Sequence, residues 1–339
     1  MESERRPRLT PAIADVRRAV RGCIDDLAPA SMDELLLVAL SGGADSLALA
    51  AAAAFEAPRS GMRAGAVIVD HSLQSDSAAV AERAAVQARS LGLDPVLVAR
   101  VDVASSTDAG GPEAAARDAR YRALNAAVAE TGALAMLVGH TLDDQAETVL
   151  LGLARGSGAA SLQGMAAASG HLRRPLLAIR RSTTRQYCID AGLDVWDDPH
   201  NEDDGYARVR VRSSVLPVLE AQLGPGIAEA LARTAEQLRE DSEALDSMVE
   251  ETIEEICEPA EAGIAVSVGA LAANPAALRQ RIIRHVVDSE FGVSLSRVQT
   301  LAVARLVTDW HGQKSLDLPG IRVKRDGGLI VFTAASTPI

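Results

Sequence analysis

The stretch Leu35–Leu49 reads LLLVALSGGADSLAL and combines three features in order. An apolar run comes first and predicts a buried strand, and the residues from Ser46 onward predict a helix. Between them, Ser-Gly-Gly-Ala-Asp-Ser at 41–46 supplies small side chains that let the backbone approach an anion. Backbone N–H groups at the helix start and the positive end of the helix dipole point at the same place. The stretch therefore predicts a phosphate-binding loop.

The first half of the chain repeats this alternation of apolar runs and helical patterns. Strands are predicted at Glu34–Leu40, Ala64–Asp70, Pro95–Val101 and Leu134–Gly139. Helices are predicted at Ser46–Phe55, Asp76–Leu91, Pro112–Thr131 and Asp143–Ala154, with caps at Asp45, Ser75 and Leu142–Asp143. This alternation is typical of an α/β domain with a doubly wound parallel sheet.

The second half is predicted to be mainly helical. One helix runs from an N-cap at Ser182 to Ala191, and a long, increasingly acidic helical stretch begins at Val215. Helices at Asn274–Asp288 and Ser296–Thr308 follow, then a short β unit with strands Ser315–Leu318, Arg322–Lys324 and Leu329–Phe332. We therefore expect a catalytic domain at 1–215, a helical linker at 216–260 and a small α/β domain at 261–339.

Composition narrows the class of protein. The chain has 339 residues, 48% of them hydrophobic, and three widely separated cysteines without a C-x-x-C pair. That cysteine usage argues against a disulfide framework and against a cysteine-rich zinc site. The N-terminus lacks the apolar core of a signal peptide, and no apolar run reaches the length of a membrane span. A soluble cytoplasmic protein without membrane contact is expected.

The net charge of −12 is concentrated in one segment. Residues 236–261 hold eleven carboxylates against the single Arg239. Residues 171–185 hold five arginines and 207–212 hold three more, with no acid in either stretch. Counterion release depends on local charge, so these arginines can neutralise phosphates in spite of the global sign, although solvated edges would look the same.

A second strand-to-helix junction carries charged side chains. His140 follows a predicted strand, and Asp144 and Glu147 lie three apart on the next helix, so both carboxylates share one face. Open α/β sheets bind ligands at the edge where these residues fall. The two carboxylates can hold Mg²⁺ or a substrate ammonium group, or they are simply an exposed acidic helix start.

Several motifs give the chain a family resemblance. The Ser-Gly-Gly-x-Asp-Ser loop resembles the PP-loop of ATP pyrophosphatases and not the G-x-x-x-x-G-K-[ST] loop, since the chain has no Gly-Lys pair. Over about residues 35–220, further blocks resemble the tRNA(Ile)-lysidine synthetases in order and spacing. These blocks are Val69–Leu73, Glu113–Tyr121, Gly139–Thr148, Leu153–Gly158, Arg174–Leu177 and Asp198–Asn201.

The resemblance implies a fold and a reaction. The fold would be a PP-loop (adenine nucleotide alpha hydrolase-like) domain, followed by a mainly helical C-terminal domain with a short β unit. The enzyme would be a ligase that forms a carbon–nitrogen bond. ATP, with Mg²⁺, would adenylate the C2 oxygen of the first anticodon cytidine of tRNA(Ile) with a CAU anticodon. The ε-amino group of L-lysine would then attack, giving lysidine, AMP and pyrophosphate. A homodimer is compatible with this resemblance, and the sequence leaves the oligomeric state open.

The resemblance also assigns roles to residues. The loop that would hold ATP consists of Ser41, Gly42, Gly43, Ala44, Asp45 and Ser46. The catalytic set would be Asp45, His140, Asp144 and Glu147, with His71 as a weaker candidate. Asp144 and Glu147 would bind lysine, whereas a metal would be held by Asp45 and Asp144. Contacts to tRNA or phosphate would come from Arg117, Arg120, Arg208 and Arg212.

Two departures from the family pattern concern RNA contacts. The chain reads Arg208-Val209-Arg210-Val211-Arg212 where the family usually has Arg-Asn-x-x-Arg, and Gln74 stands where an arginine is usual. The chain also ends soon after Gly312–Gly320, so a further tRNA-binding domain of the longest family members is expected to be absent.

The sequence argues against three other functions. A tRNA cytidine thiolase would generally need a cysteine pair or an iron–sulfur cluster, which the three cysteines do not provide. An amidating synthetase would need an ammonia source. A non-catalytic RNA scaffold would have no need of Asp45, Asp144 and Glu147 together.

Overall fold

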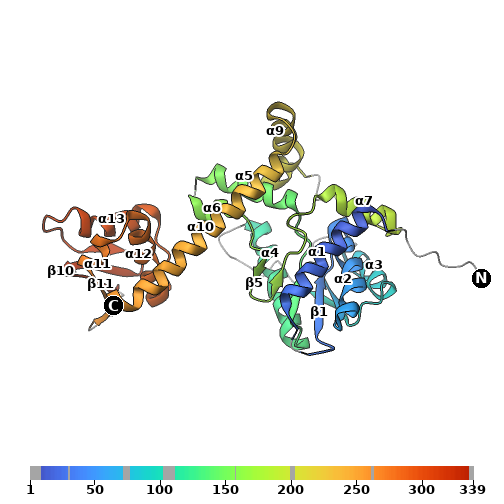
Figure 1. Ribbon diagram of the computed structural model, residues 1–339, viewed down its shortest axis with the longest axis horizontal. Helices are drawn as coiled ribbons and strands as arrows, with labels where there is room; N and C mark the ends of the chain where they lie inside the picture. Colours follow the sequence, from blue (N-terminus) through green and yellow to red (C-terminus); the bar gives the residue numbers. More distant parts are fainter. Residues whose placement is uncertain are drawn as a thin grey trace, which may run out of the picture. The chain divides into compact units, whose positions relative to one another are not determined.

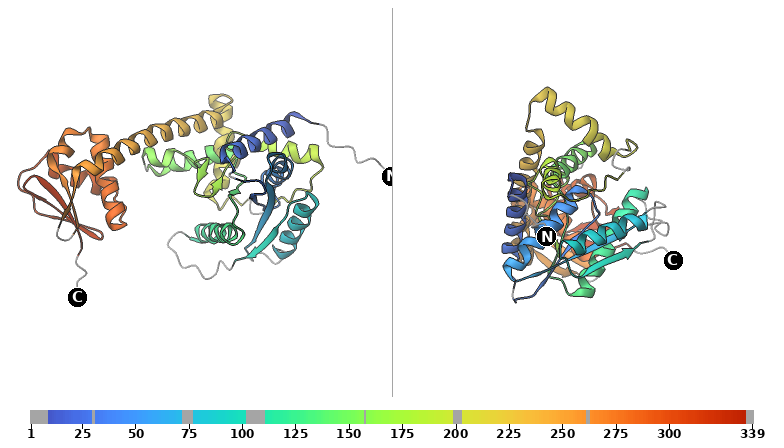
Figure 2. Two further views of the ribbon diagram at one scale, coloured as in Figure 1. Left: turned by 60° about the horizontal axis from the view of Figure 1, so that its bottom comes forward. Right: turned by 90° about the vertical axis from the view of Figure 1, so that its right-hand side faces the viewer.

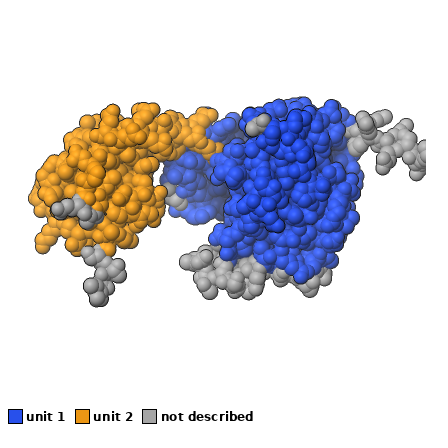
Figure 3. Space-filling model, turned by 90° about the horizontal axis from the view of Figure 1, so that it is seen from below, with its two compact units in different colours: residues 1–238 blue, residues 239–339 orange. Residues whose placement is uncertain are grey.

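The computed structural model describes residues 9–29, 31–71, 77–101, 111–156, 158–198, 203–260 and 263–335. The chain divides into two compact units, Met1–Leu238 and Arg239–Ile339 (Figure 3). The boundary between them falls inside the segment 216–260 that was expected to be a helical linker, within helix α10 (Ile227–Ile256). In the part of the chain described, no helix combines the length and apolar character needed to cross a membrane.

Unit 1 is built on a six-stranded sheet in the order β3-β2-β1-β4-β6-β5 (Figure 1). Its strands are β1 (Leu35–Ala39), β2 (Arg63–Asp70), β3 (Val96–Arg100), β4 (Ala135–Leu137), β5 (Ala168–Ser169) and β6 (Leu172–Arg173). All neighbouring strands are parallel except β5 and β6. The chain moves outward from β1 to β3 and then crosses back to β4 on the other side of β1. The doubly wound parallel sheet is therefore confirmed, with its ligand-binding crevice expected beside β1 and β4.

Helices cover both faces of this sheet (Figures 1 and 2). Alternate residues of β1 explain why, because Leu36 and Val38 join one core cluster and Leu35 and Leu37 join the other. The first cluster is formed with α1 (Pro11–Leu27), α2 (Ala44–Glu56), α3 (Ser77–Ser90) and α7 (Arg181–Ala191). The second is formed with α4 (Gly111–Thr131).

Helix α2 lies at the centre of the first cluster. Its alanines at 48, 50, 52 and 53 are fully buried, and such small side chains let α1 and α7 pack closely against it. The sequence analysis assigned no element to α1, although Thr10 caps it and Pro11 begins it. Burial of its Ile13, Val16 and Val20 against α2 and α7 is a tertiary effect.

The predicted helix starts were shifted in three places. Gly43, not Asp45, is the N-cap of α2, because the Asp45 carboxylate accepts a hydrogen bond from Thr184. Thr141 and Asp144 form a capping box that begins α5 (Leu142–Arg155). Helix α7 starts at Arg181 instead of after Ser182, because the Asp143 carboxylate on α5 accepts the Arg181 backbone N–H. The predicted Ser75 cap and the block residues Ser72, Leu73, Gln74 and Pro199–Asn201 lie outside the described residues.

Short helices complete unit 1. They are η1 (Ala57–Ser60), α6 (Ala159–Leu162), α8 (Ala207–Arg210), the π-helical turn η3 (Val211–Val215) and α9 (Leu216–Leu223). Leu142 and Ala146 of α5 pack against Leu216 of α9 and Ala228 of α10. This small cluster fixes the position of α8 and η3, which carry two of the predicted RNA-binding arginines.

Unit 2 has its own core and an antiparallel sheet in the order β7-β8-β11-β10-β9. The elements are α11 (Val268–Ala273), α12 (Ala276–Phe291), α13 (Arg297–Thr308), β7 (Cys257–Ala260), β8 (Gly263–Ser267), β9 (Leu316–Leu318), β10 (Ile321–Asp326) and β11 (Leu329–Ala334). The predicted helices and the hairpin of β10 and β11 are confirmed. The sequence analysis missed β7 and β8, because Cys-Glu-Pro-Ala shows no strand-like alternation and pairs only through β8.

Candidate active site

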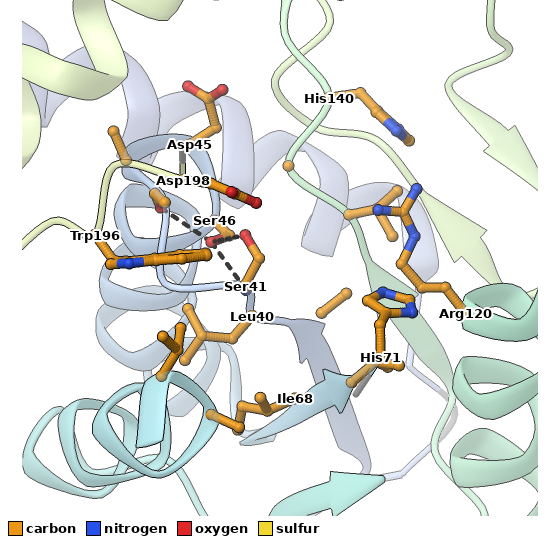
Figure 4. Close-up of a pocket in the computed structure, with 18 of the residues that line it drawn as sticks. Leu40, Ser41, Asp45, Ser46, Ile68, His71, Arg120, His140, Trp196 and Asp198 are labelled. Atoms are coloured by element: carbon orange, nitrogen blue, oxygen red, sulfur yellow. Dashed lines mark hydrogen bonds between the residues drawn. The ribbon is translucent and has the colours of Figure 1, made fainter. Parts of the chain in front are cut away.

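Hydrogen bonds fix the conformation of the loop between β1 and α2. Gly42 has a φ of 87°, in the left-handed region that favours glycine. The Ser46 hydroxyl accepts the Ser41 N–H at 3.1 Å and donates to the Gly43 carbonyl at 3.0 Å (Figure 4). The backbone N–H of Trp196 donates to the Gly42 carbonyl at 3.0 Å. Gly43 caps α2 without a side chain, so the first-turn N–H groups stay available to an anion.

A cavity of about 750 Å³ opens over this loop at the carboxyl ends of β1, β2 and β4. Its volume is in the range of pockets that hold a ligand of nucleotide size. Charged and aromatic residues from several elements line it: Asp45, His71, Arg120, His140, Asp144, Arg181, Trp196, Arg208 and Arg212. The structure thus brings the predicted phosphate loop and the second junction into one site, which Figure 4 shows around Ser41 and Ser46.

Three carboxylates meet in this site, and we call Asp45, Asp144 and Glu147 the acid cluster. Glu147 is fully buried and Asp144 is 8% exposed. The Arg181 guanidinium lies among all three. Its Nε is 3.5 Å from Asp45 Oδ2, its Nη2 is 2.8 Å from Asp144 Oδ1, and its Nη1 is 3.2 Å from Glu147 Oε1. One arginine therefore neutralises side chains from α2 and α5 together.

Two more arginines form ion pairs with Glu147. They are Arg208 and Arg212, which were predicted as contacts to tRNA or phosphate. Arg212 binds it through two nitrogens, with Nε 2.7 Å from Oε1 and Nη2 3.1 Å from Oε2. Arg208 Nε is 3.6 Å from Glu147 Oε2, and its Nη2 donates to Thr148 Oγ1 at 3.0 Å. In this structure both arginines are ion-paired, and their contact with RNA stays a prediction.

Burial and charge act against each other on the acid cluster. Burial raises the pKa of Asp45, with the Thr184 hydrogen bond and Arg181 opposing it. Burial also acts to raise the pKa of Asp144, but Arg181 and the Thr141 N–H and hydroxyl, each 2.8 Å from Oδ2, hold it below its usual value. The Asp144 carboxylate is therefore ionised at neutral pH.

His140 is kept neutral. Burial lowers its pKa to about 4, aided by nearby arginines and opposed by Asp144. Arg174 Nε donates to His140 Nδ1 at 3.3 Å, which leaves Nε2 to carry the ring hydrogen. Burial and the charge of Arg120 likewise lower the pKa of His71. Its buried Nδ1 has no hydrogen-bond partner among the described residues.

The structure separates Arg117 from Arg120. Arg120 lines the cavity, and within the described ranges no carboxylate forms an ion pair with it. Burial lowers its pKa, and the neighbouring charges of Arg117 and Arg208 add to that effect, while Tyr121 opposes it. Both guanidinium groups contact the Tyr121 ring, with the carbon of Arg117 5.0 Å and that of Arg120 5.7 Å from the centroid, but Arg117 is not among the residues that line the cavity. Arg120 is the better placed of the two for an anionic ligand.

Sequence reasoning missed Arg181 and Trp196 as site residues. Arg181 was counted only as one of five arginines in a basic stretch, and nothing local distinguishes it from its neighbours. The aromatic ring of Trp196, one of two tryptophans in the chain, was a signal worth following, since exposed or cavity-lining tryptophans often contact ligands.

Comparisons with known proteins match two parts of the chain to known domains. Residues 16–219 match a family model described as a PP-loop domain, and residues 267–329 match one described as a TilS substrate binding domain. The structure is also similar to the U34-tRNA thiolase NcsA from Methanococcus maripaludis, with a TM-score of 0.57 at 20% identity, covering 68% of this chain and 80% of that one. The latter likeness concerns the fold alone.

Curated relatives identify the family more closely. A tRNA(Ile)-lysidine synthase of Leifsonia xyli is 64% identical over 90% of this chain and 91% of its own length. One of Streptomyces coelicolor is 52% identical over 88% and 85%, and one of Thermobifida fusca is 50% identical over 95% and 98%. With its PP-loop sheet, its ligand-sized cavity and these relatives, the chain belongs to the tRNA(Ile)-lysidine synthase family.

Proposed function

We propose that this cavity carries out the family reaction, the ATP-dependent ligation of L-lysine to C2 of the first anticodon cytidine of tRNA(Ile) with a CAU anticodon. One observation carries the proposal: the anion-binding loop lines the same cavity as Asp45 and Asp144, to which the buried Glu147 is joined through Arg181. A site that must activate one substrate with ATP and present an amine to it needs both features within reach of each other.

The loop serves ATP. Residues 41–46 hold the phosphates through backbone N–H groups and the hydroxyls of Ser41 and Ser46, which lie 3.0 Å apart. The α-phosphate is thereby presented to the cytidine C2 oxygen, and AMP later leaves with that oxygen while pyrophosphate departs in the first step. Arg120 is the cation that faces the developing negative charge, since it is not already paired with a described carboxylate.

The acid cluster fits Mg²⁺ only in part. Among the described residues no group of three or more His, Cys, Asp or Glu side chains could hold a metal ion by itself. Asp144 and Glu147 already have arginines or Thr141 at their oxygens, whereas Asp45 Oδ2 has only Arg181 Nε at 3.5 Å. Asp45 is thus the residue that would hold Mg²⁺, with ATP phosphates and water as the other ligands. The ion would neutralise charge on the phosphates.

Asp144 and Glu147 bind the lysine substrate. Carboxylates are the natural partners of its cationic groups, and both side chains are buried, which strengthens the attraction. Neutral His140 lies at the same junction and can hydrogen-bond a substrate without adding charge. It orients the reacting groups, and its low pKa removes it as a proton donor near pH 7.

Arginines and the second unit serve tRNA. Arg117, Arg120, Arg208 and Arg212 contact RNA or phosphate in this proposal. The bounds expected from the sequence, a catalytic domain at 1–215, a helical linker at 216–260 and a small domain at 261–339, remain a proposal beside the two compact units, which divide after Leu238. The enzyme works in the cytoplasm, where tRNA is modified, and we propose a homodimer as its assembly.

Transfer of labelled lysine tests the proposal. The full chain, ATP and Mg²⁺ are mixed with unmodified isoleucine tRNA that has a CAU anticodon, and methionine tRNA is the control. We expect label only in the isoleucine tRNA, and none with Asp45→Asn. Asp15→Asn, an exposed carboxylate of α1, is the matched control and should retain transfer. Cleavage of ATP to AMP without lysine transfer would point to another acceptor and reject the proposal.

A further inference from the structure

The Arg181 side chain occupies the middle of the acid cluster. Each of its three guanidinium nitrogens faces a different carboxylate, at 3.5 Å from Asp45, 2.8 Å from Asp144 and 3.2 Å from Glu147. Its backbone is fixed separately, because its N–H donates to Asp143 Oδ2 at 2.8 Å. The guanidinium can therefore leave the cluster by side-chain rotation while helix α7 stays in place.

The carboxylates that should receive lysine already have arginine cations at their oxygens. Both oxygens of Glu147 accept hydrogen bonds from Arg212, and one of them also accepts Arg181. Asp144 Oδ2 accepts two hydrogen bonds from Thr141, and Oδ1 accepts one from Arg181 at 2.8 Å with Arg212 Nη2 at 3.6 Å. An alkylammonium group needs acceptors for three N–H donors, so a resident cation must move before lysine can bind here.

Among the resident cations, Arg181 is the one whose departure opens the whole cluster. Arg212 binds Glu147 bidentately, at 2.7 and 3.1 Å, a geometry that resists exchange. Arg208 reaches only Glu147 in the cluster, at 3.6 Å. Arg181 makes one contact with each carboxylate, and removing it frees an oxygen face on all three.

We propose that Arg181 stands in for the substrate cation, and that lysine takes its place when the site is loaded. This inference rests on the proposed function. Charge supports the exchange, because three carboxylates face Arg181, Arg208 and Arg212, and a fourth cation would leave buried positive charge unpaired. ATP brings phosphates into the same cavity that Arg181 lines, and these offer the displaced guanidinium a new partner. Lysine should consequently bind better after the nucleotide.

Equilibrium binding of labelled lysine to the full chain tests the exchange. It is measured with and without an α,β-methylene ATP analogue, which binds without being cleaved. In the wild type we expect weak lysine binding alone and tighter binding with the analogue. In Arg181→Met the lysine Kd without analogue should fall at least about tenfold, if Arg181 has left the acid cluster in fewer than about a tenth of the wild-type molecules. The analogue should then add little, because the two ligands are coupled through Arg181.

Arg185→Met is the matched control. Arg185 lies one turn further along α7 and lines the same cavity, but it pairs with Asp197 and not with the acid cluster. Its lysine Kd without the analogue should match the wild type. Circular dichroism and the Tm report whether each variant is folded, and the wild-type measurement of coupling needs no variant at all.

The sign of the effect decides the question. Weaker lysine binding in folded Arg181→Met would mean that Arg181 supports the lysine site instead of filling it, and would overturn the inference. Wild-type lysine binding that ignores the analogue would overturn it as well. Failure of the proposed function looks different, because the wild type would then transfer no lysine to tRNA.

Discussion

Replacing Glu147 by glutamine should destabilise unit 1, because the arginines around Glu147 would lose a hydrogen-bond acceptor and their counter-charge. Glu147 is fully buried, and its Oε1 accepts Arg181 at 3.2 Å and Arg212 at 2.7 Å, while Oε2 accepts Arg212 at 3.1 Å. Glutamine keeps one acceptor oxygen but turns an N–H₂ group toward an arginine that is itself a donor. The arginines also lose their counter-charge in a site that excludes much of the solvent.

The magnitude follows from the cost of breaking a buried ion pair, roughly 3–5 kcal/mol. Because glutamine retains one acceptor, we expect about 3 kcal/mol, at the lower end of that range. For a unit of this size that corresponds to a decrease in Tm of about 6–12 °C. An exposed pair supplies the contrast: Glu82 and Arg89 are 3.2 Å apart with both side chains more than half exposed, so Glu82→Gln should cost below about 0.5 kcal/mol.

Urea unfolding followed by tryptophan fluorescence measures the difference. The chain has two tryptophans, Trp196 in unit 1 and Trp310 in unit 2, so a Trp310→Phe background confines the signal to unit 1. Equal midpoints for Glu147→Gln and Glu82→Gln would refute the reasoning, because they would mean that the buried pairs contribute no more than a surface pair. A change in slope instead of midpoint would point to altered cooperativity.

Three further outcomes are expected. Gly42→Ala should raise the KM for ATP, because a φ of 87° costs an alanine about 1–2 kcal/mol in the loop proposed to bind the phosphates; Gly92→Ala, at a φ of 85° in open space, should cost similar stability and leave KM unchanged. His140 has a pKa of about 4 in the folded chain and about 6.5 in the unfolded chain, so its contribution to the free energy of unfolding is complete above pH 6.5 and is lost as pH falls toward 4. His140→Asn should reduce this decline in the free energy of unfolding by about 2–3 kcal/mol, measured by urea unfolding. Arg120→Met should weaken tRNA binding and reduce its salt dependence in filter binding, whereas Arg117→Met, outside the cavity lining, should change both less, and equal effects would contradict the separation of the two.

Much of the fold was accessible from local pattern. Strands β1 to β4 and helices α2 to α5 lie within a few residues of their predicted bounds, because burial on a two-sided parallel sheet demands continuous apolar runs. Helix starts were less predictable. The carboxylates of Asp45 and Asp143 are used by Thr184 and by the Arg181 N–H, partners from a distant part of the chain. Strand β7 was missed for a related reason, since its only sheet neighbour is β8.

Local sequence predicted the loop at 41–46, the two junction carboxylates and the family. Each depends on residues that lie within one turn or one strand of each other. The identity of their partners was not. Arg181 lies 34 positions from Glu147 and Arg212 lies 65 from it, and they are brought there by the packing of α7 against α2 and of η3 against α5. A sequence lists charges without saying which of them share a buried site. Folding decides that, because desolvation makes an unpaired buried carboxylate costly and so selects the packing that supplies each one with a cation.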